Sequence, residues 1–227
     1  QSESQLRLYS NDCDQLLRLQ RLPNEPLSTI STLIRTSHEC RRKQILVDHA
    51  LNIGQKTTKF RELLDERMIM CEYEIINGMT RDDMLADYKR RRELLLTKYN
   101  MRATRGQTKR EIHWMILEEL QSETHEALSG EMLYQEKLLF QDKCSSDVGV
   151  GLVFKSTKKS KLDLCTLKLA STNIHLSFGG KYDTGANGLA YPLLMLVAAM
   201  KVFDVKIVSS IVMVLTDPNF IQLFSQE

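Results

Sequence analysis

The chain has 227 residues, of which 42% are hydrophobic and 26% charged, and its formal net charge is +2. This hydrophobic content suffices for a buried core and argues against wholesale disorder. The near balance of charge argues against a dedicated nucleic-acid binder, whose surface would be clearly basic. Five cysteines are scattered without close pairs, which indicates reduced thiols and an intracellular protein, cytoplasmic or nuclear.

Proline is absent between Pro26 and Pro192, so long helices can run through most of the chain. Charge is unevenly distributed, because 47 of the first 147 residues are charged but only 13 of the last 80. We therefore predict three parts. These are an N-terminal helix and linker over 1–26, a helical bundle or coiled-coil region over 27–144, and a small α+β domain over 145–227.

The first part of the chain is expected to form several helices. A short helix over 5–21 ends before Pro23, and the next, capped by Ser28 or Thr29, runs to about Asn52 and ends at Gly54. The segment 56–77 is the third. It carries apolar side chains at spacings of four, three and four residues, which form one helical face: Leu64, Met68, Cys71 and Ile75.

Gly78 is placed to end that helix, and Thr80, with Asp82 and Asp83 in the following turn, predicts the start of another. After a break around residues 100–107, a capping-box pattern over 108–111 predicts a further amphipathic helix that extends to about residue 141.

Two arrangements of these helices are possible from the sequence. A continuous dimeric coiled coil would place Asp82, Lys89 and Arg92 at seam positions when the stripe is extended in heptads, and charges are poor seam residues. Glycines near the expected helix ends favour helices that fold back on one another. The bundle, or a broken and partly folded-back coil, is therefore the preferred interpretation, with the continuous coil as the alternative.

From residue 148 the pattern changes to alternation of apolar and polar residues, which predicts strands over 148–154, 162–169 and 173–178. A helix over 189–203 packed on the sheet should follow, then a strand or buried helix over 205–215. A last short helix should open at Asp217-Pro218. The expected fold class is α+β: an N-terminal long-helix bundle or broken coiled coil followed by a small antiparallel α+β (RWD-like) module.

The dipeptide Tyr191-Pro192, which follows the third predicted strand, is similar to the Tyr-Pro turn of RWD-like domains. In arrangement, the chain resembles coiled-coil proteins that end in such a domain, as in several kinetochore subunits. The resemblance covers about 80 residues at the C-terminal end and implies a role in assembly, although layout alone is an analogy.

Motifs for chemistry are incomplete in this sequence. The glycine-rich stretch 179–188 lacks both ends of a phosphate-binding loop, and the calcium-loop pattern has Leu194 where the closing Glu belongs. The sequence contains no C-x-x-C, H-E-x-x-H or G-x-S-x-G pattern. We therefore predict no catalytic, cofactor-binding or metal-binding residue, no cofactor, and a protein that is not an enzyme.

The function expected from these patterns is that of a non-catalytic structural or adaptor subunit of a larger complex. It would bind protein partners through amphipathic helices and the C-terminal module, as a hetero-oligomer or a homodimer. A transmembrane segment is not expected, since charges interrupt the apolar stretch 189–215. The candidate partner-binding residues are the stripe and the basic cluster that follows it: Leu64, Met68, Cys71, Ile75, Leu85, Tyr88, Lys89, Arg90, Arg91 and Arg92.

Two alternatives remain open. One is a nucleic-acid-associated helical protein that uses the basic cluster from Lys89 to Arg92. The other is an enzyme whose site is built from residues distant in sequence, which would reveal itself as a pocket containing groups with shifted pKa.

Overall fold

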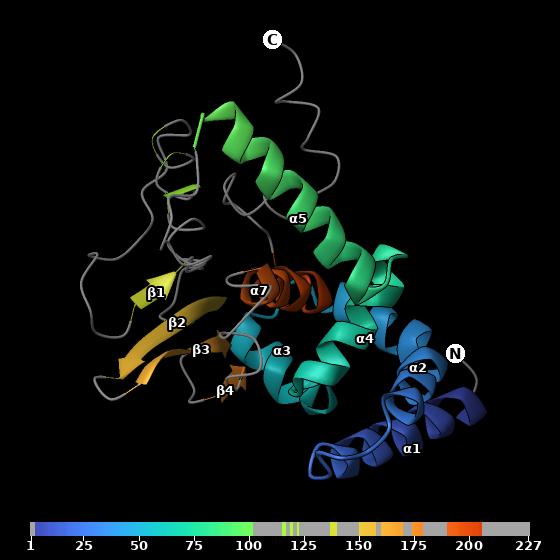
Figure 1. Ribbon diagram of the computed structural model, residues 1–227. Helices are drawn as coiled ribbons and strands as arrows, with labels where there is room; N and C mark the ends of the chain where they lie inside the picture. Colours follow the sequence, from blue (N-terminus) through green and yellow to red (C-terminus); the bar gives the residue numbers. More distant parts are fainter. Residues whose placement is uncertain are drawn as a thin grey trace.

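The computed structural model describes residues 3–101, 115–116, 119, 122, 137–139, 150–157, 160–169, 174–178 and 190–205. Most of this part is helical (Figure 1). The helices of the first hundred residues fold back on one another as a bundle, and one further helix from the C-terminal region joins them. Their bounds are α1 (Glu3–Leu19), α2 (Leu27–Val47), α3 (Ile53–Lys59), the 3-10 turn η1 (Arg61–Leu63), α4 (Glu66–Asn77), α5 (Arg81–Lys98) and α7 (Ala190–Val202).

Local capping interactions fix several of these boundaries. Gly78 ends α4 with φ +68, a left-handed conformation that suits glycine. Thr80 and Asp83 form a capping box at the start of α5, with the Asp83 backbone N–H donating to Thr80 Oγ1 at 3.2 Å. Both boundaries were predicted and are confirmed.

The helices expected over 28–52 and 56–77 are each divided differently from the prediction. Asn52 caps α3 instead of ending α2, since its side chain accepts from the Gln55 backbone N–H at 2.9 Å. Asp65 caps α4, accepting from the Arg67 backbone N–H at 2.8 Å. The Asp65 cap opens a new helix within a segment predicted to be continuous, whereas the Asn52 cap opens a helix across the break that was expected at Gly54.

Helix α7 lies inside the molecule. Of its residues whose burial is described, Lys201 alone is exposed, and the others are apolar and buried. The helix packs against α4 and α5 and against strands β2 (Val150–Thr157) and β3 (Ser160–Leu169), and Figure 1 shows it between the sheet and α4. A helix that is apolar on all sides needs this kind of enclosure.

Two cations from the N-terminal bundle bind the C-terminal end of α7. Arg42 of α2 donates to the carbonyl oxygens of Lys201 at 3.0 Å and Val202 at 3.1 Å. Lys56, on α3, donates to the Asp204 carbonyl oxygen at 3.2 Å. Positive charge at a helix C-terminus satisfies the last carbonyl groups and complements the helix dipole, so these contacts fix α7 in the bundle.

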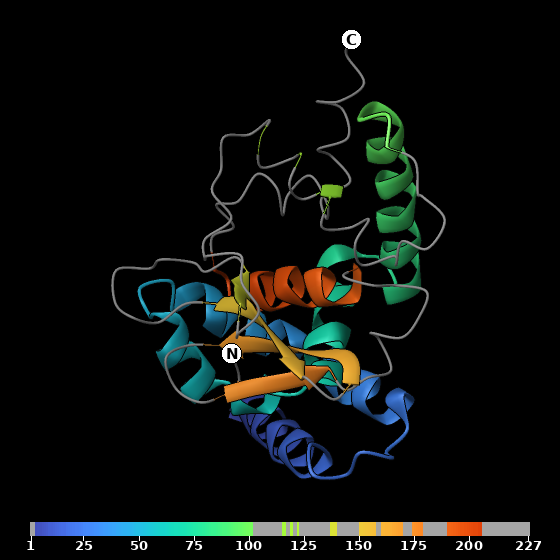
Figure 2. The ribbon, with the colours of Figure 1, turned by 60° about the vertical axis from the view of Figure 1, so that its left-hand side comes forward.

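The described strands form one antiparallel sheet in the order β1-β2-β3-β4, where β1 is Lys137–Leu139 and β4 is Ile174–Phe178. Figure 2 shows β2, β3 and β4 side by side. The register pairs Leu152 with Leu167 and is irregular between Lys155 and Thr157. The segment 137–139 was expected to end a helix and is a strand instead. The predicted helix over 108–141 otherwise lies mostly outside the described residues, as do segments 206–215 and 217–225.

The predicted α+β fold class with a separate RWD-like module is wrong. The described chain is predominantly helical, and α7 packs against α4 and α5 of the N-terminal bundle as well as against β2 and β3, so it does not belong to a separate C-terminal module. Tyr191, half of the dipeptide that supported the resemblance, is the second residue of α7 and hydrogen-bonds to Glu66 of α4. The physical reason is that a sheet covers only one side of α7, whereas its side chains are apolar all round and need helices on the other sides.

Within the described ranges, the helices lack the combination of length and apolar character that is needed to cross a bilayer.

Candidate functional site

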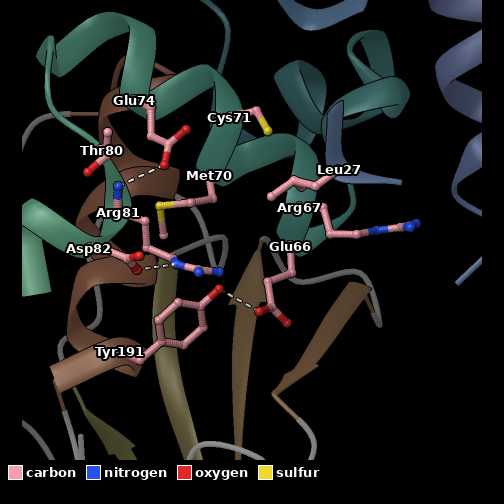
Figure 3. Close-up of a pocket in the computed structure, with 10 residues that line it drawn as sticks. All are labelled: Leu27, Glu66, Arg67, Met70, Cys71, Glu74, Thr80, Arg81, Asp82 and Tyr191. Carbon is pink, nitrogen blue, oxygen red and sulfur yellow. Dashed lines mark hydrogen bonds and ion pairs between the residues drawn. The ribbon is translucent and has the colours of Figure 1, made fainter. Parts of the chain in front are cut away.

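A pocket of about 420 Å³ opens where the first turns of four helices meet (Figure 3). Leu27 is the first residue of α2, Glu66 of α4 and Arg81 of α5, while Tyr191 is the second of α7. The caps at Asp65 and Thr80 and the proline at the start of α2 place these helix starts. The ten lining residues are Leu27, Glu66, Arg67, Met70, Cys71, Glu74, Thr80, Arg81, Asp82 and Tyr191.

Carboxylates of the pocket hold the neighbouring helices in position. The Tyr191 hydroxyl donates to Glu66 Oε1 at 2.5 Å, and the Arg81 backbone N–H donates to Glu74 Oε1 at 2.7 Å. The Arg81 side chain donates through Nε to Asp82 Oδ1 at 3.3 Å. Negative charge beside the first turn of a helix complements its dipole, so the acidic residues stabilise the walls of the pocket.

Arg67 contributes its aliphatic stem to the wall, while its guanidinium extends away from Tyr191 (Figure 3). The guanidinium donates to the carbonyl oxygens of Leu19 at 3.1 Å and Leu22 at 3.0 Å. A side-chain hydrogen bond with Asp65 raises the pKa of Arg67, so its charge is permanent. The pocket wall is thereby tied to the connection between α1 and α2.

The Cys71 thiol in the pocket is a poor nucleophile at neutral pH. Burial, with a smaller contribution from the Glu74 carboxylate, raises the pKa of the Cys71 thiol to about 11. A thiol with such a pKa is almost entirely protonated at neutral pH and is a poor nucleophile. In the part of the chain that the structure describes, no three His, Cys, Asp or Glu side chains come together as metal ligands.

A second polar cluster lies between α2 and α4. The side chains of Arg41 and Glu72 are both 0% exposed and form an ion pair between Arg41 Nη2 and Glu72 Oε2. Arg41 also donates to Ser37 Oγ at 2.7 Å and to the Ile34 carbonyl oxygen at 3.1 Å. His38 Nδ1 lies 2.8 Å from the other oxygen of Glu72. This network supplies most of the hydrogen bonds that two buried charges require.

Beside this network, Glu62 of η1 meets the inner face of α1. The Tyr9 hydroxyl donates to Glu62 Oε1 at 3.4 Å, and the Cys13 thiol lies close enough to both groups to influence their pKa values. Burial raises the pKa of the Glu62 carboxyl group. Burial also raises the pKa of the Cys13 thiol, to about 12, and that of the Tyr9 hydroxyl.

The predicted apolar stripe turns toward the inside of the chain. Met68, Cys71 and Tyr88 are buried in the core. Leu64, Ile75 and Leu85 are half-buried and pack against it. Leu64 lies between η1 and α4, so the four predicted stripe residues do not share one helix; Met68, Cys71 and Ile75 do lie together on α4. The described contacts of these side chains are within the chain. Partner binding by this set stays a prediction.

The predicted basic cluster is divided between surface and interior. Lys89 and Arg90 are exposed, whereas Arg91 is buried and forms an ion pair with Asp87. Arg92 is half-buried and pairs with Glu93 at 2.5 Å. Arg90 also pairs with Asp87 at 2.5 Å, so the cluster presents far less free positive charge than its sequence suggests.

Of the ten pocket residues, only Cys71 was singled out from the sequence as a candidate for partner binding. Thr80 and Asp82 marked the start of α5, whereas the cap and first-turn acid at Asp65 and Glu66 were available but went unused, because 56–77 was predicted as one helix. Nothing in the sequence indicated that Tyr191 would meet them, because the residues are more than a hundred positions apart.

The chain matches no protein-family model, and no curated protein or solved structure matches it. Inference about function therefore depends on the geometry of the pocket and of the surfaces around it.

Proposed function

We propose that the chain is a non-catalytic adaptor subunit of a multiprotein complex, and that the pocket at the four helix starts receives a segment of a partner protein. The observation that carries this proposal is the pocket itself. It combines charges of both signs with an apolar wall, and it lies beside exposed leucine side chains.

The size and lining of the pocket suit a short polypeptide segment. A volume of about 420 Å³ lies within the range of roughly 300–1,000 Å³ that is usual for binding pockets. Leu27, on its rim, is 49% exposed, and Leu22, in the connection that Arg67 holds, is 50% exposed. Exposed apolar side chains surrounded by polar groups are typical of sites where partner proteins dock.

The polar groups of the pocket favour binding over chemistry. Glu66 and Glu74 accept hydrogen bonds from neighbouring helices. Cys71 is held in its protonated form at neutral pH by its raised pKa. A catalytic acid, base or nucleophile needs to change protonation or to attack, and these groups instead support the structure.

The nucleic-acid alternative is less well supported. Phosphate binding needs several exposed cations on one face, whereas Arg91 is buried and Arg92 is paired with Glu93. Lys89 and Arg90 remain at the surface, and Arg90 shares Asp87 with Arg91.

The proposal is tested by affinity purification and mass spectrometry with matched variants. The variant Leu27→Asp places charge on the rim of the pocket without removing a buried side chain. The control is Val47→Asp, because Val47 is 76% exposed, also apolar, and lies at the opposite end of α2 from Leu27. Circular dichroism establishes that all three proteins are equally folded.

We expect wild type and Val47→Asp to enrich the same partner. The amount of this partner recovered with the rim variant should be at least tenfold lower. Direct binding of that partner, purified, should show the same order of affinities. Equal recovery by the rim variant, or the absence of any partner above background, would refute a role for the pocket in assembly.

A further inference from the structure

The two halves of α1 are attached to the bundle very differently. In the C-terminal half, Leu16 is fully buried, and Gln20 beyond the helix end donates to the Arg61 carbonyl oxygen at 2.8 Å. In the first half, residues 3–8 are all exposed, and Leu8 is 64% exposed. Residues 3–13, called the arm from here on, are attached chiefly through polar groups on one face.

The polar attachments of the arm converge on Glu62 and Thr36. Tyr9 donates to Glu62 at 3.4 Å, a long hydrogen bond, and Asp12 accepts from Thr36 Oγ1 at 2.9 Å. Cys13 contacts Glu62 through its thiol. Because one end of a helix opens at little cost when few apolar contacts hold it, these groups decide whether the arm stays in place.

Glu62 lacks an ion-pair partner among the described residues, although Arg41 is close enough to influence it electrostatically. The terminal nitrogens of Arg41 bind Glu72, Ser37 and the Ile34 carbonyl, and its buried Nε has no hydrogen-bond partner. An ionised Glu62 carboxylate would therefore be stabilised chiefly by the Tyr9 hydroxyl, the Cys13 thiol and its own backbone N–H.

The charges around Glu62 also do not balance. One guanidinium, Arg41, serves two buried carboxylates, Glu62 and Glu72, and His38 contacts Glu72. Placing an unpaired charge in such an interior is costly, and the usual outcome is that the group takes up a proton. Burial accordingly raises the pKa of Glu62, against the opposing effects of its backbone N–H, Arg41, Cys13 and Tyr9.

We propose that the protonation state of Glu62 controls the position of the arm. The arm is seated on η1 when Glu62 is a neutral carboxylic acid. When the proton passes to solvent, the carboxylate hydrates, Tyr9 leaves it, and the first half of α1 detaches. The C-terminal half stays attached through Leu16 and Gln20, so the change is local.

The direction with pH follows from linkage. In the seated state the Glu62 pKa is raised, whereas in the detached state it approaches the ordinary value of about 4.3. Seating is therefore strongest below that ordinary value and weakens as pH rises toward the raised pKa. One titrating group changes the equilibrium constant for seating by at most tenfold per pH unit. Above the raised pKa, this constant no longer depends on pH.

Hydrogen exchange of the full chain tests this proposal. Protection factors, in which the intrinsic effect of pH on exchange is divided out, are measured for amides 9–13 between pH 5 and pH 8. Amides of α4 serve as the internal reference. In wild type we expect the protection of the arm to fall by up to tenfold per pH unit before levelling, while α4 stays constant.

The variants make the test specific to Glu62. Glu62→Gln should give protection that does not vary with pH, because glutamine stays neutral. Asp14→Asn removes an exposed carboxylate of α1 and should behave as wild type. Tyr9→Phe removes a donor to the carboxylate, so its midpoint should move to higher pH.

Equal pH dependence in wild type and Glu62→Gln overturns the proposal. So does a wild-type arm whose protection does not change between pH 5 and pH 8. If Glu62→Gln is poorly folded, the Tyr9→Phe midpoint decides the question, and a shift to lower pH or no shift refutes control by Glu62.

Discussion

The buried ion pair between Arg41 and Glu72 predicts a large and non-additive effect on stability. Both side chains are 0% exposed. The substitution Glu72→Gln leaves the Arg41 guanidinium its hydrogen bonds to Ser37 Oγ and the Ile34 carbonyl oxygen, but removes its ion-pair partner. Removing one partner of a buried pair costs about 3–5 kcal/mol.

That loss is a substantial part of a total stability of roughly 5–15 kcal/mol. With a shift of about 2–4 °C per kcal/mol for a domain of this size, the melting temperature should fall by roughly 6–20 °C. Urea denaturation followed by far-UV circular dichroism gives the free energy of unfolding, and calorimetry gives the melting temperature.

The double variant Arg41→Met/Glu72→Met should be far less destabilised than the sum of the two single variants. Replacing both charges removes their desolvation cost, Ser37 keeps its bond to the Leu33 carbonyl oxygen at 2.6 Å, and partly exposed His38 can turn to water. The control is Glu39→Gln, which breaks an exposed ion pair with Lys43 and should change stability by less than about 1 kcal/mol. A Glu72→Gln variant within about 1 kcal/mol of wild type, or additive single and double variants, would refute this account of the network.

Three further predictions concern the pocket and its surroundings. Tyr191→Phe removes the hydrogen bond to Glu66 and should cost about 1.5–3 kcal/mol by urea denaturation; a loss below about 0.5 kcal/mol would mean that this bond does not hold α7 to α4. Gly78→Ala should cost about 1–2 kcal/mol because of φ +68 alone, as a Cβ there meets nothing within 4 Å, and unchanged stability would contradict the strain. Cys71, with its raised pKa of about 11, should react with iodoacetamide at pH 8 at least tenfold more slowly than in the urea-unfolded chain, as measured by mass spectrometry; equal rates would show that the thiol is accessible.

Capping signals were predictable from the sequence because they depend on residues within one turn. Thr80 with Asp83 and the glycine at position 78 act over three or four positions, and each alone defines a helix boundary. The same locality misled the interpretation of segment 56–77, where apolar spacing continues across the cap at Asp65. Periodicity describes a face, and it does not reveal that the chain has turned between two helices.

The long-range features were not predictable from the sequence. Arg41 stands in a run of three basic residues that is typical of a solvated surface, and its burial depends on Glu72 of another helix. The pocket depends likewise on residues near positions 27, 66, 81 and 191. The helix around Tyr191 was expected, but its place was not, since an apolar helix can pack on a sheet or inside a bundle and only the whole fold selects one.

The packing of α7 against the N-terminal bundle has a consequence for synthesis of the protein on the ribosome. Roughly ninety residues separate the end of α5 from the start of α7, and at ordinary elongation rates they take about 5–20 s to emerge. During that interval the apolar surface of α4 and α5 that α7 later covers is exposed, and Arg42 and Lys56 lack the carbonyl groups that they bind in the folded chain. Completion of the core is thus postponed until after α7 has left the exit tunnel, and the waiting chain is a natural client for chaperones.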